Sequence, residues 1–383
     1  MQHINTVFSQ LLTEIPRYEF NKVVNRYHGD KREGSMSCWT QFCAMLYGQL
    51  SGRKSLREIS LTWESHRHKH YHTGASEAKR STLSDANRER PSGIYLEVFY
   101  WLLNQLRKPE MKHEDAVRLI DSTTIDLCKQ QFNWATFRSA KAGIKVHTVY
   151  DPKANVPTFF SITEASKHDK KAAEEMPLLD GATYVFDRAY NDYAWYYNMD
   201  QRDIRFVGRM KSNARFNVVK ELEPLGEGVL KDEIIRLSSA KAQSDCPIKL
   251  RRIQFIRKED NKLLSFITND MERSAEEIAA LYKQRWHIEL FFKWIKQNLK
   301  IKRLVGRSEN AVKTQIIIAM IAYLLLKLIN KNSNSKVTLH QLATLVAVNI
   351  MERRNITELL MRKKPPEPDE KNINQMTLVF TGQ

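Results

Sequence analysis

Residues 117–125 read VRLIDSTTI, a run of branched and apolar side chains that contains one carboxylate, Asp121. Such a composition favours a β-strand. Two further β-rich runs follow, GIKVHTVY at 143–150 and PTFFSIT at 157–163. A helix is then expected over 167–179, a strand at 182–187 (ATYVFD), a second helix and a strand at 204–207. Three strands in succession, then helix, strand, helix and strand, predict a mixed α/β sheet.

The pattern changes on both sides of this region. Residues 1 to about 110 carry apolar side chains at helical spacing, among them Phe42, Leu46 and Leu50, which predicts a bundle of short helices. Between 212 and 270, four β-rich runs at 217–219, 234–237, 248–256 and 263–268 predict a β-rich insertion. A long helix over 274–299 and two or three further helices are expected after it.

These patterns divide the chain into five segments. A helical N-terminal domain covers 1–112, and the core of the mixed sheet covers 113–211 and resumes at 271–350, where it includes C-terminal helices. The insertion at 212–270 separates the two parts of the core. The tail at 351–383 holds a stretch rich in proline and charge, Lys363 to Asp369, that is expected to be disordered.

The composition indicates a polyanionic partner. Lys and Arg number 61 against 44 Asp and Glu, a formal charge of +17. From Phe291 to Lys364 there are 15 basic residues and three acids, a net charge of +12. Solvated helices are also basic, so the position of this segment, directly after the motif described below, is what favours a nucleic-acid face.

Other features bear on the compartment. The four cysteines are scattered, which is typical of reduced, mostly buried thiols. The N-terminus lacks a basic region followed by a long apolar run, so no signal peptide is expected. The longest apolar stretch, Ile316 to Leu326, spans 11 residues and is interpreted as a core helix, because a bilayer span needs about 20. We expect a soluble cytoplasmic protein that is not associated with a membrane.

Two aspartates stand beside buried apolar runs. Asp121 follows Leu119 and Ile120, and Asp187 follows Val185 and Phe186. A carboxylate in such a place costs several kcal/mol unless it is paired or binds a cation. On neighbouring strands the two could hold divalent cations that clamp the oxygens of a phosphoryl displacement. The structural alternatives are an Asx turn at Asp121 and a simple pairing of Asp187 with Arg188.

A glutamate on the expected long helix supplies a third acid. Tyr282, Arg285, Glu289 and Lys296 are separated by offsets of 3, 7 and 14 residues, which places them within an arc of roughly 60° on one face of the helix. The structural alternative is a solvated face held by Arg285–Glu289 and Glu289–Lys293 ion pairs. Basic residues around a lone glutamate equally suit a site where DNA meets a metal ion.

The segments IDSTTIDL, VFDRAYNDY and YKQRWHIELFFKWIKQ resemble the three conserved blocks of DDE transposases from bacterial insertion sequences. The last is similar to the signature of the YREK branch at all four named positions. GIKVHTVYD and FVGRMKSN also resemble blocks of this family. The resemblance extends from about residue 10 to 350.

The resemblance implies an RNase H-like catalytic core in which Asp121, Asp187 and Glu289 bind Mg²⁺ or Mn²⁺. It implies cleavage of the element's ends in double-stranded DNA, then strand transfer into target DNA by the liberated 3′-hydroxyl, within a homodimer. In the same branch, the Tyr, Arg and Lys of the signature contact phosphates near the cleavage site. The DNA-binding residues expected here are Tyr282, Arg285, Lys296, Arg209, Lys211 and Lys293.

Two departures from the family pattern matter. Ala189 stands where the family often has glycine, so the turn after Asp187 must avoid a positive φ or tolerate some strain. Some relatives stack a flipped base on a tryptophan near the end of the insertion. Phe266 is the one aromatic residue in the corresponding strand here, which puts a hairpin intermediate in doubt.

Several alternatives stay open at this stage. His66, His68, His70 and His72 alternate, and zinc binding is conceivable, but no cysteine lies at zinc-finger spacing and a polar or DNA-contacting loop is favoured. His287 lies about 160° from Glu289 around the helix and is not expected to be catalytic. Besides a transposase, the sequence admits an RNase H-like nuclease without strand transfer, or a catalytically silent DNA-binding protein derived from a transposase.

Overall fold

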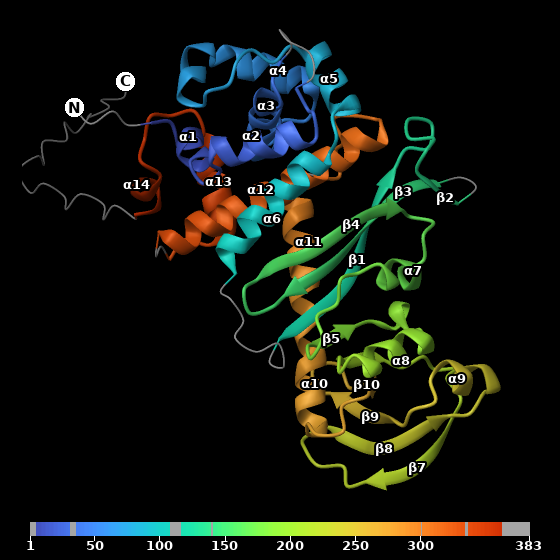
Figure 1. The fold of residues 1–383 in the computed structure, drawn as a ribbon. Coiled ribbons are helices and arrows are strands. Elements are labelled where there is room, and N and C mark those ends of the chain that lie inside the picture. The colour runs from blue at the N-terminus through green and yellow to red at the C-terminus, as the bar shows by residue number, and fades with distance from the viewer. Residues whose placement is uncertain are drawn as a thin grey trace, which may run out of the picture.

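A computed structural model of the chain describes residues 5–30, 36–107, 116–138, 141–299, 301–333 and 336–361. Figure 1 shows three layers of organisation along its length: a body of helices, a sheet in the middle, and further strands at the far end. The tail from Lys363 to Asp369, predicted to be disordered, lies outside the described residues.

The described residues up to Arg107 are mainly helical, as predicted. The helices that the structure describes in this part are α1 (Val7–Leu12), α2 (Arg17–Arg26), α3 (Cys38–Leu50), α4 (Leu56–Ser65), the 3₁₀ turn η1 (Arg67–His72), α5 (Arg80–Glu89) and α6 (Gly93–Leu106). Ser37 and Ser55 cap α3 and α4, each accepting a hydrogen bond from a backbone N–H in the first turn. α3 is buried along its whole length, because the other helices surround it.

The middle of the chain builds the predicted mixed sheet. Its elements are β1 (Val117–Leu127), β2 (Thr136–Arg138), β3 (Lys141–Asp151), β4 (Val156–Glu164), α7 (Asp169–Glu174), β5 (Thr183–Phe186), η3 (Arg188–Tyr190), α8 (Tyr193–Gln201) and β6 (Arg205–Arg209). β3 lies between β1 and β4, antiparallel to both, whereas β5 runs parallel to β1 and β6 parallel to β5. Asp121, within β1, and Asp187, directly after β5, are therefore carried by neighbouring strands in the middle of the sheet.

The insertion continues this sheet. Its strands are β7 (Phe216–Leu222), β8 (Val229–Leu237), β9 (Leu250–Arg257) and β10 (Lys262–Thr268), with a short helix α9 (Ala240–Asp245) that the sequence did not predict. β10 pairs with β6, so that one ten-stranded sheet forms. Nine of its strands follow the order β2-β3-β1-β5-β6-β10-β9-β8-β7, and the tenth, β4, pairs with β3 off this path. The division between core and insertion stays a prediction, because hydrogen bonding runs across it.

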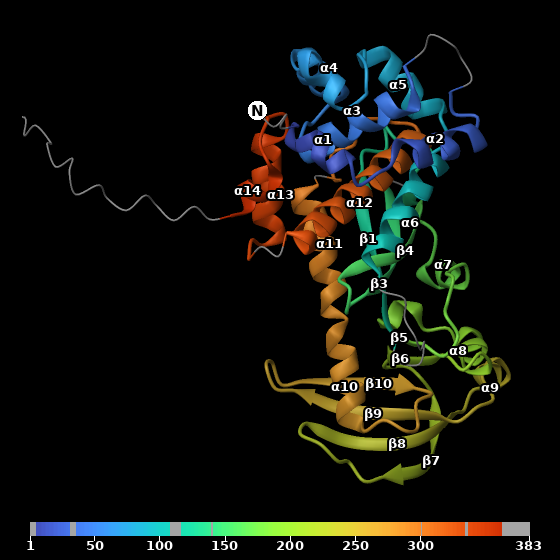
Figure 2. The same cartoon turned by 60° about the vertical axis from the view of Figure 1, so that its left-hand side comes forward.

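The C-terminal helices cover one face of the sheet. They are α10 (Ala275–Gln284), α11 (Trp286–Asn298), α12 (Glu309–Asn332), α13 (Leu339–Asn349) and α14 (Ile356–Leu360). The predicted single helix over 274–299 is interrupted at Arg285, which separates α10 from α11. In Figures 1 and 2, α10 and α11 follow one another from the inserted strands to the helical body.

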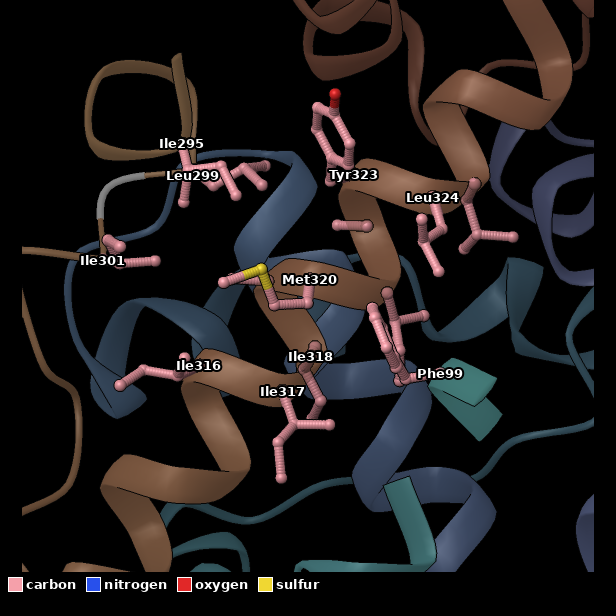
Figure 3. Packing of buried hydrophobic residues seen from close by; sticks show 14 of the residues in the cluster. Phe99, Ile295, Leu299, Ile301, Ile316, Ile317, Ile318, Met320, Tyr323 and Leu324 are labelled. Atoms are coloured by element: carbon pink, nitrogen blue, oxygen red, sulfur yellow. The ribbon is translucent and has the colours of Figure 1, made fainter. Parts of the chain in front are cut away.

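α12 forms the centre of the helical body. Among the described residues, α12 is the helix that is long and apolar enough to cross a membrane by length and composition alone. Most of its apolar stretch is buried inside the protein. Figure 3 shows Met320 and Leu324 of α12 with Phe99 of α6 and Ile295 of α11 around them. The helix has the role of a core helix that was predicted from its apolar stretch.

The two faces of the sheet bury two separate cores. Leu119 belongs to the core shared with α6, α11 and α12, whereas the next residue, Ile120, belongs to a core with α8 and η3. Successive side chains of a strand point to opposite faces. Asp121 therefore lies on the side of α11, and Ser122 lies on the side of α7 and η3.

Candidate active site

Strand register brings the two aspartates together. Ile120 of β1 pairs with Phe186 of the adjacent parallel strand β5. Asp121 and Asp187 are the next residues on these two strands, so both stand at the same level of the sheet. Asp187 ends its strand and caps η3, accepting a hydrogen bond from the backbone N–H of Arg188 at 2.7 Å.

Helix α11 brings the glutamate to the same place. α11 packs on β1 through buried side chains, including Ile288 and Ile295. Glu289 follows Ile288 and stays half-buried, with 33% of its side chain exposed. It points toward the aspartates, because one guanidinium joins it to Asp121.

That guanidinium belongs to Arg285, at the interruption between α10 and α11. Its Nη1 donates to Oδ2 of Asp121 at 3.2 Å, and its Nη2 donates to Oε1 of Glu289 at 2.6 Å. Of the structural alternatives considered for these two residues, the Arg285–Glu289 ion pair is present, and at Asp121 the local contact is a hydrogen bond from the backbone N–H of Ser122 at 2.8 Å. Neither local contact separates Asp121 from Glu289, because Arg285 bridges them.

Tyr282 reaches the second aspartate from the last turn of α10. Its hydroxyl lies 3.5 Å from Oδ1 of Asp187. Its ring packs on Phe266 of β10, with 4.7 Å between ring centroids. Phe266 is 1% exposed, so it is not available to stack on a nucleobase, in agreement with the doubt raised from the sequence.

The electrostatics of the cluster are those of acids held close together. Burial raises the pKa of Asp121 to about 6, Arg285 lowers it in part, and the negative charges of Glu289 and Asp187 raise it further. Burial and the Asp187 charge likewise raise the pKa of Tyr282, whereas Arg285 and Arg209 lower it. The negative charges of Glu289 and Asp187 therefore both act on Asp121, as expected of carboxylates that share a cation.

The donor set suits a hard divalent cation, since it consists of carboxylate oxygens only. A buried hydroxyl beside it supports this assignment: Thr148 pairs with Asp121 across β1 and β3, and its Oγ1 has no hydrogen-bond partner. Within the described parts of the chain, no three Asp, Glu, His or Cys side chains lie close enough to coordinate a metal ion. Arg285 bridges two of the acids, so coordination requires this cationic side chain to yield its place.

An open cavity of about 570 Å³ adjoins Asp187. It is lined by the turn after β5 and the segment after β6, namely Asp187, Arg188, Ala189, Lys211, Ser212 and Asn213. Ala189 lies in the 3₁₀ turn η3 and has no positive φ, as its replacement of glycine requires. Two basic side chains thus line a hollow next to the second acid.

The other basic residues named from the sequence lie apart from the acids. Lys296 belongs to α11, as Glu289 does, but the charges that act on it are those of Lys302 and Asp126. Burial is the main cause that lowers the pKa of Lys296, and the positive charge of Lys302 lowers it further. Lys293 is exposed. Arg209 ends β6 and acts on Tyr282. Of the predicted DNA contacts, Tyr282 and Arg285 are those that the structure joins to the acids.

The alternating histidines have a structural role where they are buried. His70 is 5% exposed, stacks on Trp63 with 4.3 Å between centroids, and its Nε2 lies 2.9 Å from the Trp63 carbonyl. Nδ1 of His72 lies 3.2 Å from Asn5. These contacts account for two of the four histidines without a metal. His287 is exposed on α11.

Sequence reasoning missed a polar cluster on the opposite face of the sheet. Ser122, Lys145, His147 and Asp169 meet there, and Asp169 accepts from Ser122 at 2.7 Å and from Lys145 at 3.0 Å. The signal that could have found two of them is a charged side chain and a histidine at alternate positions of the otherwise apolar strand GIKVHTVY. Asp169 lies in a separate segment and gave no such signal.

Comparison with known proteins identifies the class. A family model described as the transposase DDE domain matches residues 112–325, which include all three acids. The chain therefore belongs to the DDE transposases, as the resemblance to insertion-sequence enzymes predicted. A second model, a domain of unknown function (DUF4372), matches residues 3–76.

Two relatives are similar to this chain over most of its length. "Putative transposase y4zB" of Sinorhizobium fredii is 38% identical over 290 residues, which is 74% of this chain and 80% of that protein. "Probable transposase for insertion sequence element IS5377" of Geobacillus stearothermophilus is 31% identical over 253 residues, 64% of this chain and 66% of that protein. Among solved structures, a piggyBac transposase synaptic complex with hairpin DNA aligns with a TM-score of 0.43 and 12% identity, covering 96% of this chain and 87% of that chain.

Proposed function

We propose that this transposase cuts the ends of its own insertion sequence and joins them to target DNA by two-metal-ion phosphoryl transfer. The observation that carries the proposal is the convergence of three acids that are far apart in the sequence: Arg285 bridges Asp121 and Glu289, and the charge of Asp187 acts on Asp121 from the adjacent strand. Three buried or half-buried acids with one counter-charge leave an excess of negative charge, which a divalent cation neutralises.

An RNase H-like core supports the same function. Three antiparallel strands, β4, β3 and β1, are followed by the parallel strands β5 and β6, and the first two acids stand on the central strands. This is the arrangement that the resemblance to DDE transposases implied. We propose Mg²⁺ or Mn²⁺ as the cofactor, held by Asp121, Asp187 and Glu289.

The chain's own residues would divide the work as follows. The three carboxylates hold the cations, which supply charge neutralisation for the attacking and leaving oxygens when they are bound. Arg285 turns from its carboxylates toward a phosphate, which offers the same charge-assisted, two-pronged hydrogen bonding. Tyr282 positions Asp187 through its hydroxyl, and Lys211 offers a positive charge in the cavity beside Asp187.

DNA binding extends beyond the acids in this proposal. Lys293, Lys296, Arg209 and Lys211 neutralise phosphates along the flank of the cluster, and the net charge of +17 favours association with a long polyanion. The helical N-terminal domain binds the element's ends as double-stranded DNA. The active unit is a homodimer on DNA, in the cytoplasm and at the nucleoid.

The test is a cleavage and joining assay with purified protein, a DNA fragment that carries the terminal inverted repeats flanking this gene, and a target plasmid. Mg²⁺-dependent release of the ends and their covalent joining to the plasmid are expected. Release without joined products identifies a nuclease instead. Binding to the ends without release in either Mg²⁺ or Mn²⁺ identifies a silent DNA-binding protein, and either result contradicts the proposal.

A further inference from the structure

The polar cluster of Ser122, Lys145, His147 and Asp169 lies directly behind Asp121, on the other face of the sheet. Ser122 connects the two faces: its backbone N–H donates to Asp121 at 2.8 Å, and its hydroxyl donates to Asp169 at 2.7 Å. One residue of β1 therefore touches both acids. A displacement of Asp169 is transmitted to the carboxylate of Asp121 through a single side chain.

Asp169 is held from three directions. Besides Ser122, it accepts a hydrogen bond from Nζ of Lys145 at 3.0 Å, in an ion pair whose side chains are only 16% and 17% exposed. Nδ1 of His147 lies 3.5 Å from the same carboxylate, and Nε2 of His147 lies 3.0 Å from the hydroxyl of Thr163. Burial lowers the pKa of His147 to about 4, so Lys145 is the cation that balances Asp169 near neutral pH.

The cluster also touches the turn that carries the second aspartate. Tyr190 lies three residues after Asp187 in η3, which packs against α7, the helix that begins with Asp169. The side chain of Tyr190 is 1% exposed. Burial, and then the negative charges of Asp169 and Asp121, raise the pKa of Tyr190 well above its usual value.

An ordinary buried ion pair would not require this arrangement. The Lys145–Asp169 pair alone could stabilise the fold from any position on the sheet. Here Ser122 connects the pair to the first acid, and the pair stands at the start of α7, which packs on η3, the turn that the second acid caps. Both aspartates that the proposed function assigns to the metal are thus supported from one point.

We propose that Asp169 is a positioning residue for this site: through Ser122, and through the packing of α7 on η3, it fixes the first two acids, Asp121 and Asp187, at the separation that a divalent cation requires. The inference rests on the proposed function, since it assumes that these acids bind metal. Hydrogen-bonded partners of metal ligands orient them, and their loss weakens metal affinity or activity by about 10–100-fold.

The experiment measures Mn²⁺ binding to the full-length protein without DNA, by electron paramagnetic resonance of the free ion. A triple variant, Asp121→Asn, Asp187→Asn and Glu289→Gln, defines the background to be subtracted. Asp169→Asn, which keeps the shape and removes the charge, is expected to weaken site-specific Mn²⁺ binding about 10-fold or more. Glu175→Gln, which breaks the Lys167–Glu175 pair just beyond the last residue of α7, is the matched control and should bind as wild type.

A second pair of variants separates positioning from folding. Ser122→Ala removes the hydroxyl that reaches Asp169, and Ser122→Thr keeps it. Ser122→Ala should weaken Mn²⁺ binding as Asp169→Asn does, whereas Ser122→Thr should bind as wild type. The double variant Ser122→Ala/Asp169→Asn should bind Mn²⁺ no more weakly than the weaker-binding of the two single variants, because both changes break the same connection. The comparison of Ser122→Ala with Ser122→Thr tests the inference even if Asp169→Asn is too unstable to purify.

Two outcomes contradict the inference and are distinguishable. If the wild type binds no Mn²⁺ above the triple variant, the proposed metal site is wrong and the positioning role falls with it. If the wild type binds Mn²⁺ and the Asp169→Asn or Ser122→Ala variants bind it equally well, with at most a lower melting temperature, the metal site stands and Asp169 is merely structural.

Discussion

Arg285, at the junction of α10 and α11, donates a hydrogen bond from Nη1 to Oδ2 of Asp121 at 3.2 Å. The same group bonds to Glu289, so the chain supplies its own cation where the proposed function places a metal. In the structure this arginine pairs with two carboxylates. Under the proposed function it would leave them and bind a DNA phosphate once the metal ions are bound.

Removing this cation should destabilise the metal-free protein. Arg285→Gln leaves two half-buried carboxylates without their counter-charge, and we expect a loss of about 1–3 kcal/mol in the free energy of unfolding, measured with urea in the presence of EDTA. Saturating Mn²⁺ should narrow this difference, because the ion takes over the neutralising role. Arg257→Gln, which breaks the exposed Arg257–Asp260 pair, should change stability by less than about 0.5 kcal/mol and serves as the control. Equal stabilisation of wild type and Arg285→Gln by Mn²⁺ would contradict this account.

Asp121 should make stability depend on pH in the direction opposite to most aspartates. Its folded-state pKa of about 6 lies above the usual 3.8, so between these values the native protein binds more protons than the unfolded chain. Its contribution is therefore most favourable below about pH 4 and declines as the pH rises through 6. Asp121→Asn should be more stable than wild type by about 1–3 kcal/mol at pH 7.5 in EDTA, with the gap closing toward about pH 4. A gap that is constant across this range would rule out the raised pKa.

The three acids should be individually indispensable for cleavage. Asp121→Asn, Asp187→Asn and Glu289→Gln each remove one negative ligand, and we expect each to reduce metal-dependent cleavage of the element's ends by about a thousandfold or more. Binding to the same DNA, measured by fluorescence anisotropy, should stay within a few-fold of wild type. The control is Asp180→Asn, which loses only a pair with Arg202 in which the Asp180 side chain is 72% exposed. Full cleavage by two of the three single variants would overturn the assignment.

A buried ion pair should hold the inserted strands together. Arg251 of β9 donates to both carboxylate oxygens of Asp232 of β8, at 2.8 and 2.6 Å, and both side chains are at most 6% exposed. Arg251 also donates to the carbonyl of Arg273, just before α10. Asp232→Asn leaves a buried guanidinium unbalanced, and we expect a loss of about 3–5 kcal/mol by urea denaturation. Lys258→Gln, which breaks an exposed pair with Glu227, should have little effect, and similar losses in both variants would show that burial is not the cause.

Much of the fold could be predicted from local patterns. The alternation around Asp121, the short strand before Asp187 and the apolar face of the helix around Glu289 all depend on neighbours in sequence, and each was found where expected. Short-range signals misled at the helix that follows β4. The helix expected over 167–179 is limited to Asp169–Glu174, since Pro177 cannot continue it.

The remainder depends on contacts that no local pattern encodes. The pairing of β10 with β6 joins the insertion to the core, and it is a choice of sheet edge made in three dimensions. The interruption at Arg285 lies within an uninterrupted apolar periodicity, which gives no reason for a break. Asp169 supports Asp121 from the opposite face of a strand, and such a relationship requires the register of β1 against β3.

The continuity of the ten-stranded sheet has a mechanical consequence. Hydrogen bonds run without a gap from β7 at the outer edge, through β10 and β6, to β5, whose last residue precedes Asp187. No flexible linker separates the outer strands from the acids. Under the proposed function, a load applied to the far end by a bent duplex or a second subunit would therefore reach the strand beside the second aspartate through backbone hydrogen bonds.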